Sequence, residues 1–318
     1  MDDPGTLGLM VGVLVLLGAA TFALRALKRQ TEASINPAIL ETFRLRVRAW
    51  WILFSTLAAA LLLGPVVTTI LFGLLAFWAL REFITLTPTR PGDHRTLFWV
   101  FFLFTPLQFV LVGMGEYQLY SIAIPVYAFL FIPARIAMDG DHKRFLERTA
   151  KIQAGLLICV YCLSYAPALL TLGTVERPIN STGLLLFFVV MVQLSDVLQY
   201  AWAQIPSRHV IVPTISPSRT WEGLLGGTIS TSLLGAVLWW ATPFPGGYFW
   251  LAALLSAVIA LMGFAGGLTM SAIKRDRGVQ DFGTLVEGHG GVLDRIDSIC
   301  FAAPVFFHLT RWLLTYFP

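Results

Sequence analysis

The sequence predicts an all-α, polytopic integral membrane protein with about ten transmembrane helices. Hydrophobic residues make up 57% of the 318 residues, charged residues make up 13%, and the mean hydropathy is +0.75. Soluble domains carry about 25% charged residues, so the composition excludes an ordinary soluble fold. Uncharged stretches also recur along the chain, and roughly 20 apolar residues suffice to cross a bilayer.

Ten hydrophobic stretches are the predicted spans. The second and third are short, and we expect them to form a hairpin around Gly64-Pro65. The spans cover residues 6–24, 50–64, 65–80, 97–114, 119–134, 152–172, 183–203, 223–242, 249–270 and 298–316.

The distribution of positive charge predicts an N-terminus outside the cell. Cytoplasmic flanks of spans collect Lys and Arg. With the N-terminus outside, the segments that face the cytoplasm carry 20 of the 22 basic residues, and these segments are 25–49, 81–96, 135–151, 204–222 and 271–297. We therefore expect a multi-pass protein of the cell inner (cytoplasmic) membrane. The net charge of +4 follows from this topology and implies no nucleic-acid partner.

A polar block lies between the last two predicted spans, from Ser271 to Ser298. A membrane protein has no packing reason to concentrate charge and glycine there. The block holds a basic pair, an isolated carboxylate, a glycine-rich turn and a carboxylate couple: Lys274 and Arg275, Asp281, Gly288-His289-Gly290-Gly291, and Asp294 with Asp297.

Asp294 and Asp297 are three residues apart, so on a helix they share one face. One interpretation is capping, because carboxylates suit a helix N-terminus. The other is a divalent cation site, since Mg²⁺ prefers one or two carboxylates together with substrate phosphate oxygens. The preceding glycines would let backbone N–H groups approach an anion.

Two further polar features lie upstream. Gln193, Asp196 and Tyr200 form a polar stripe within an apolar span. A carboxylate in lipid costs a few kcal/mol, so Asp196 should face the protein interior, bound either to a metal or to a structural partner. Residues 216–223 read SPSRTWEG; Ser216 and Pro217 suit the start of a helix, which leaves the later basic, aromatic and acidic residues unexplained.

Residues 196–298 resemble the phosphatidate cytidylyltransferases, also called CDP-diacylglycerol synthases. That family shows S-x-x-K-R, a K-D pair, P-G-H-G-G and D-R-x-D-S in this order, with S-P-K-K-T-W-E-G and an Asp four residues before a Tyr upstream. The present chain departs at three positions, where Gln280 and Ser218 replace lysines and Glu287 replaces a proline. Arg219 replaces another lysine conservatively.

The resemblance implies transfer of CMP from CTP to a phosphatidate-type lipid, giving CDP-diacylglycerol and pyrophosphate. Residues 1–180 would form a transmembrane scaffold, and 181–318 a catalytic region opening to the cytoplasm. The implied catalytic residues are Asp196, Asp281, Asp294 and Lys274. The implied ligands of Mg²⁺ or another divalent cation are Asp196, Asp281, Asp294 and Asp297. The implied substrate-binding residues are Ser216, Arg219, Thr220, Arg275, His289, Gly290, Gly291 and Arg295.

Two alternatives stay open. One is a related CTP-dependent lipid kinase, or a cytidylyltransferase for another lipid phosphate; the missing cations at Gln280 and Ser218 favour it. The other is a transporter or an inactive scaffold, which the retained carboxylates disfavour. The expected partners are CTP, the lipid substrate and the bilayer, and a homodimer is left open.

Overall fold

The computed structural model describes residues 4–30, 37–86, 89–173, 179–205, 209–244, 246–283 and 290–317. Within these ranges, eight helical stretches are long and apolar enough to cross a membrane. The other two predicted spans correspond to shorter apolar helices, Trp50–Leu63 at the end of α2 and Trp221–Val237. An all-α polytopic membrane architecture is therefore confirmed, while the number of ten spans stays a prediction.

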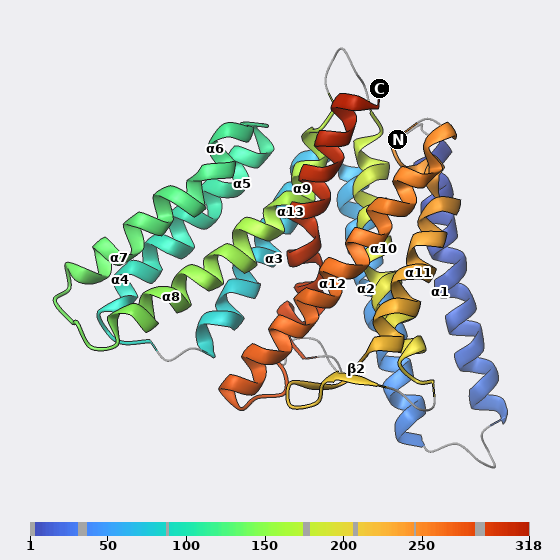
Figure 1. Cartoon of the computed structure of the whole chain (residues 1–318), viewed down its shortest axis with the longest axis horizontal. Coiled ribbons are helices and arrows are strands. Elements are labelled where there is room, and N and C mark those ends of the chain that lie inside the picture. Colours follow the sequence, from blue (N-terminus) through green and yellow to red (C-terminus); the bar gives the residue numbers. More distant parts are fainter. Residues whose placement is uncertain are drawn as a thin grey trace.

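The first helices are α1 (Pro4–Gln30), α2 (Pro37–Leu63) and α3 (Pro65–Thr85). The predicted hairpin at Gly64-Pro65 is confirmed, because α2 and α3 run in opposite directions and pack together (Figure 1). Gly64 has a φ of 110°, which a residue with a Cβ adopts only with strain. Pro65 then supplies a preset φ for the first turn of α3.

Three bent helical stretches follow, and residues 93–156 project from the rest of the molecule, whereas the end of the third stretch lies in the core (Figure 1). Two of the three π-helical turns in them lie at or just before a proline, Pro106 and Pro125, which removes a helical N–H donor and displaces the preceding turn. The stretches are α4 (Asp93–Trp99), η1 (Val100–Phe104) and α5 (Thr105–Gly113); α6 (Tyr117–Ile122), η2 (Ala123–Ala128) and α7 (Phe129–Ala137); and α8 (Phe145–Leu156), η3 (Leu157–Cys162), α9 (Leu163–Ala168) and η4 (Leu169–Thr171).

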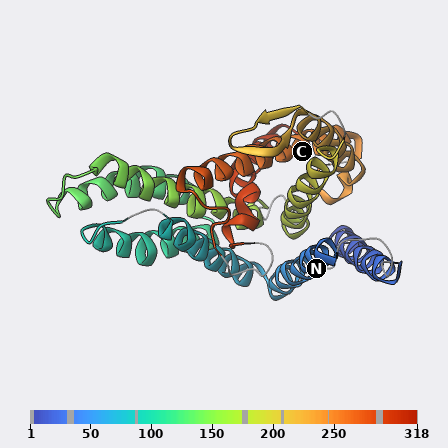
Figure 2. The same cartoon turned by 90° about the horizontal axis from the view of Figure 1, so that it is seen from below.

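The C-terminal half forms a compact group in which α11 packs between α10 and α12, and α12 packs on α13. A short antiparallel hairpin, β1 and β2, contacts α11 and α12 near the ends of these helices (Figure 2). The elements are α10 (Ser181–Trp202), β1 (Val210–Val212), β2 (Ser216–Thr220), α11 (Trp221–Val237), η5 (Trp239–Ala241), η6 (Gly246–Tyr248), α12 (Phe249–Arg277) and α13 (Leu293–Tyr316).

The predicted helix start at Ser216-Pro217 is wrong. Ser216 belongs to β2 and lies opposite Val212, and α11 begins at Trp221 with Thr220 as its N-cap residue. The Thr220 hydroxyl accepts a hydrogen bond from the N–H of Gly223 at 3.1 Å. Strand pairing therefore takes the Ser-Pro segment, and the next hydroxyl residue along the chain caps the helix instead.

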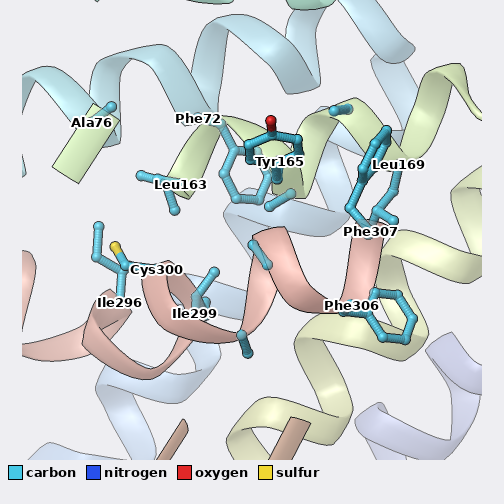
Figure 3. Packing of buried hydrophobic residues seen from close by; sticks show 14 of the residues in the cluster. Phe72, Ala76, Leu163, Tyr165, Leu169, Ile296, Ile299, Cys300, Phe306 and Phe307 are labelled. Carbon is cyan, nitrogen blue, oxygen red and sulfur yellow. The ribbon is translucent and has the colours of Figure 1, made fainter. Parts of the chain in front are cut away.

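Helix α13 lies at the centre of the core. Its apolar side chains pack against α3 and α9, as Figure 3 shows for Phe72, Ala76, Leu163, Tyr165, Leu169, Ile296, Ile299, Cys300, Phe306 and Phe307. All of these side chains are buried. The N-terminal half thus fixes the position of α13, whose first residues belong to the polar block.

The described parts of the five basic segments predicted to face the cytoplasm lie toward one end of the helices, drawn at the bottom of Figure 1. The start of α1 and the end of α13 lie at the opposite end. The basic segments thus lie at one end and the start of α1 and the end of α13 at the other, as the predicted topology requires. Which end faces the cytoplasm stays a prediction.

Candidate active site

A cavity of about 240 Å³ lies between α10, α11, α12 and α13. It is formed where the C-terminal part of α10 meets the first turns of α11 and α13. The cavity brings together five of the predicted site residues, Asp196, Arg219, Thr220, Asp294 and Asp297; its other lining residues are Gln199, Tyr200, Ala203, Ser218, Gly223, Phe264 and Ser298.

Asp196 and Asp297 meet in this cavity from different helices. The Ser298 hydroxyl donates to Asp196 Oδ1 at 3.1 Å and also lies 3.4 Å from Asp297 Oδ1. The backbone N–H of Ser298 donates to the same oxygen of Asp297 at 2.7 Å. Asp196 therefore faces the protein interior, as predicted. Two carboxylates beside a hydroxyl, open to a cavity, are a donor set that suits Mg²⁺.

Arg219 forms the basic wall of the cavity. Its Nη1 donates to Gln199 Oε1 at 3.1 Å, while Gln199 Nε2 donates to the carbonyl of Ala260 at 2.9 Å. The guanidinium carbon lies 5.1 Å from the centre of the Phe264 ring. A Cβ at Gly267 would lie only 2.1 Å from Arg219 Nη2, so glycine is required there for the guanidinium to lie against α12.

Gln199 was missed by the sequence interpretation, which placed Gln193 in the polar stripe. Gln199 is buried and lines the cavity, whereas Gln193 is not among the lining residues. Its position three residues after Asp196 on one helix was the available signal. The partner that gives Gln199 its role, Arg219, lies on β2.

Asp294 lines the cavity and also holds the polar block together. Lys274 Nζ donates to Asp294 Oδ1 at 2.9 Å. The backbone N–H groups of Phe282 and Gly291 both donate to the other oxygen, at 2.8 and 2.9 Å. Asp294 thus joins the end of α12, the loop and the start of α13, and Lys274 is paired with it.

The glycine turn packs against carboxylates. Gly290 has a φ of 79°, and a Cβ there would lie 2.7 Å from Asp294 Oδ2 and 2.8 Å from the Cβ of Asp281. A Cβ at Gly291 would lie 2.4 Å from Glu82 Oε2. We expected the backbone N–H groups of these glycines to approach substrate phosphate, and in the structure carboxylates lie beside both glycines. The N–H of Gly291 is already bonded to Asp294, so a phosphate contact at this N–H would have to replace that bond.

The other predicted site residues that the structure describes are not among those lining the cavity. Ser216 Oγ lies 3.3 Å from Ser218 Oγ, and Arg275 Nε donates to the carbonyl of Ile215 at 3.3 Å, which ties α12 to the β hairpin. Asp281 and Arg295 are not among the lining residues either. Gly288 and His289 lie outside the described residues.

The four predicted metal ligands form two pairs. In the part of the chain that the structure describes, no three His, Cys, Asp or Glu side chains are grouped as metal ligands would be. Asp196 and Asp297 share Ser298, whereas Asp281 and Asp294 both lie beside Gly290. The Asp196–Asp297 pair is the better candidate, because Asp294 already accepts three hydrogen bonds.

Glu222 lies next to the cavity-lining residue Gly223 and follows Thr220 by two residues. The backbone N–H of His209 donates to both of its oxygens, at 3.1 and 3.0 Å, and the His209 ring Nδ1 lies 2.6 Å from Oε1. The hydrogen bond with the His209 ring holds the pKa of Glu222 below its ordinary value. Glu222 therefore stays negative at neutral pH and joins the start of β1 to the first turn of α11.

This chain belongs to the cytidylyltransferase family, whose model matches residues 44–313; it is therefore a nucleotidyltransferase. An uncharacterized protein of Escherichia coli (strain K12), YnbB, is 37% identical over 273 residues, which cover 84% of this chain and 87% of that protein. Phosphatidate cytidylyltransferases of Mycobacterium bovis and Mycobacterium leprae are 36% and 38% identical over 145 and 132 residues.

These alignments with the mycobacterial enzymes cover 44% and 40% of this chain. The chain spans less than half the length of the two enzymes, 45% and 40%. The resemblance to the phosphatidate cytidylyltransferase family that the motifs indicated is thus confirmed.

Proposed function

We propose that this protein transfers CMP from CTP to the phosphate of a phosphatidate-type lipid. The observation that carries the proposal is the cavity in which Asp196 and Asp297 share Ser298 and Arg219 forms the basic wall. A triphosphate and a lipid phosphate bring several negative charges into one place. Such a reaction needs both a cation site and a fixed basic group, and this cavity supplies candidates for both.

In the proposed reaction an oxygen of the lipid phosphate attacks the α-phosphorus of CTP. A new P–O bond forms on the α-phosphorus, and the bond from this atom to the oxygen that bridges to the β-phosphate breaks. Pyrophosphate leaves with the electron pair of the broken bond. The products are CDP-diacylglycerol and pyrophosphate, and no covalent enzyme intermediate is required.

Positioning and charge neutralisation are the main means by which proteins accelerate such a transfer. Arg219, held by Gln199 and stacked on Phe264, presents a fixed guanidinium, and a guanidinium binds phosphate oxygens in a bidentate manner. A divalent cation held by Asp196 and Asp297 would neutralise charge on the triphosphate and on the leaving pyrophosphate. Lys274 is the next basic group, provided that its bond to Asp294 is exchanged for substrate.

The location of the cavity supports a lipid acceptor. Its walls include the end of α10 and the start of α13, two helices long enough to span a bilayer, and a headgroup at the membrane surface can reach such a position without leaving its leaflet. Tyr200 and Trp221 are 56% and 51% exposed near the cavity, and aromatic side chains of this kind favour the interface between lipid and water.

Ser218 gives a reason to test other lipid phosphates. It lines the cavity at a position where the phosphatidate cytidylyltransferase pattern has a lysine. A hydroxyl can donate a hydrogen bond but supplies no charge. The acceptor phosphate would therefore be bound with one cation fewer, which makes a lipid phosphate other than phosphatidate the second candidate.

The proposal is tested with purified protein in lipid vesicles and CTP labelled in either the α- or the γ-phosphate. CMP transfer puts the α label into the chloroform-soluble product and releases pyrophosphate. A lipid kinase would put the γ label into lipid instead. Vesicles with phosphatidate and vesicles with a different lipid phosphate monoester distinguish the acceptors. Absence of both labels from lipid in all vesicles would contradict the proposal and favour a transporter or an inactive scaffold.

A further inference from the structure

The end of α3 contacts the polar block although the two are about 200 residues apart in sequence. Glu82, in the last turn of α3, is 5% exposed. Its carboxylate accepts hydrogen bonds from the backbone N–H groups of Val292 and Leu293, at 2.9 and 2.8 Å. These N–H groups belong to the beginning of α13, where a helix has no backbone acceptors of its own.

Neighbouring contacts show that this position of Glu82 is built into the chain. A Cβ at Gly283 would lie 2.8 Å from Glu82 Oε1, and a Cβ at Gly291 would lie 2.4 Å from Oε2. Both sides of the loop therefore have glycine where the carboxylate lies. The Phe83 ring stacks on Phe282 with the ring centres 6.4 Å apart and the planes at 16°. Two consecutive residues of α3 thus hold the loop.

The beginning of α13 determines where the cavity carboxylate lies. Asp297 and Ser298 follow Leu293 by about one helical turn. Since a helix turn is stiff, a shift of Leu293 moves Asp297 relative to Asp196. The carboxylate of Glu82 is bonded to the N–H groups of Val292 and Leu293, neither of which lines the cavity, so its action on the site is indirect.

Resting on the proposed function, we propose that Glu82 is a positioning residue of the transferase: it fixes the start of α13, and through it the distance between Asp297 and Asp196. The anion at the start of this helix is therefore supplied by the protein itself. The consequence is specific. Loss of Glu82 should lower the rate of the chemical step much more than the affinity for CTP, because the Arg219 wall on α10, β2 and α12 does not depend on it.

The test compares Glu82→Gln with Asp93→Asn in vesicles. Both changes turn a buried carboxylate into an amide of nearly the same shape, but Asp93 binds Arg148 in the projecting helices, at 2.9 Å from Nε, and not the loop. We expect Glu82→Gln to lower kcat at least about tenfold while KM for CTP changes less than about threefold, as displacement of a reacting group predicts. Asp93→Asn should lower Tm without lowering kcat per folded protein.

A second pair of variants covers the case in which Glu82→Gln does not fold. Gly291→Ala pushes a methyl group against the same carboxylate from the loop side, and we expect the same loss in kcat. Where both variants fold, the double variant should lose no more than the worse single variant, because both changes break one contact. Additive losses, or an unchanged kcat in Glu82→Gln, would overturn the proposal.

Amide hydrogen exchange separates a failure of this proposal from a failure of the proposed function. Peptides covering the start of α13 should exchange faster in Glu82→Gln than in the unmodified protein, whether or not phosphatidate is the acceptor. Unchanged exchange at these amides would show that Glu82 does not hold the helix start. If exchange were faster in a protein that transfers no CMP, only the proposed reaction would be contradicted. The effect of Glu82→Gln would then be measured on CTP binding. A cation dependence of CTP binding equal to that of the unmodified protein would overturn the positioning role.

Discussion

The Ser298 hydroxyl lies 3.1 Å from Oδ1 of Asp196 and donates a hydrogen bond to it, which joins the interior of α10 to the first turns of α13. Asp297 precedes Ser298 and accepts from its backbone N–H. A single residue thereby orients two carboxylates from helices about 100 residues apart in sequence.

Replacement of either carboxylate of the pair should abolish CMP transfer. We expect Asp196→Asn and Asp297→Asn each to lower kcat by at least about 100-fold, or roughly 2.7 kcal/mol, and Ser298→Ala by about 10- to 100-fold, as is usual for a residue that orients a metal ligand. The measurement is α-labelled CTP incorporation at saturating Mg²⁺, with Tm in detergent as the control. If Asp196→Asn kept its activity and lost only thermal stability, Asp196 would be half of a structural pair.

Asp294 and Asp281 should differ in their effect on stability. Both Asp294→Asn and Asp281→Asn are expected to abolish turnover. Asp294 accepts bonds from Lys274 and two backbone N–H groups, and each bond to a charged group contributes about 1.5–3 kcal/mol, so Asp294→Asn should also lower Tm. Asp281 is exposed and its replacement should not. Near-normal turnover in Asp281→Asn would remove it from the site.

Gly267→Ala should weaken CTP binding in the same way as Arg219→Ala, but to a smaller extent. The added methyl carbon would lie only 2.1 Å from Arg219 Nη2, far closer than van der Waals contact, and would displace the guanidinium from Gln199 and Phe264. We expect KM for CTP to rise about tenfold, equivalent to about 1.4 kcal/mol, with a smaller change in kcat. Gly18→Ala, at a helical glycine with open space around it, is the matched control. An unchanged KM would mean that Arg219 does not bind the triphosphate.

Gln280→Lys should raise activity on phosphatidate or tighten CTP binding, by up to about tenfold. Gln280 is exposed beside Asp281, and the family pattern has a lysine there. Glutamine can donate hydrogen bonds, but it cannot offset phosphate charge. The steady-state kinetics of the variant on phosphatidate and on a second lipid phosphate decide the question. Loss of activity on phosphatidate with retention on the other lipid would favour the second acceptor.

The topology is open to direct labelling. Cysteines introduced at Gly92 and His142 should react with membrane-impermeant reagents only from the cytoplasmic side, and a cysteine at Gly247 only from outside. Gly247 has open space around it, and His142 is exposed, so neither change should disturb packing. The native cysteines are free, with Cys159 and Cys300 buried, and unmodified protein gives the background. Labelling with the opposite sidedness would place the cavity away from CTP.

The sequence by itself determined the features that depend on short stretches of chain. Spans follow from local hydropathy, because crossing a bilayer requires about 20 apolar residues in a row. The start of α13 near Asp294 and the interior location of Asp196 follow from helical spacing and from the cost of a carboxylate in lipid. The glycines at 290 and 291 were recognised as special, and the structure adds that carboxylates lie where their Cβ atoms would be.

Only the tertiary structure decided which residues meet. Ser216 fits a helix start by local preference, yet pairing with Val212 makes it part of a strand. Glu82 has no local signal of importance, and the spacing of Gln199 from Asp196 says nothing of its partner, because Arg219 and the start of α13 are 20 and about 210 residues away from Gln199 and Glu82. A carboxylate at the end of an apolar helix gives no indication of a function when only the sequence is known. Its role becomes visible only when folding places two N–H donors, and two glycines without a Cβ, against it.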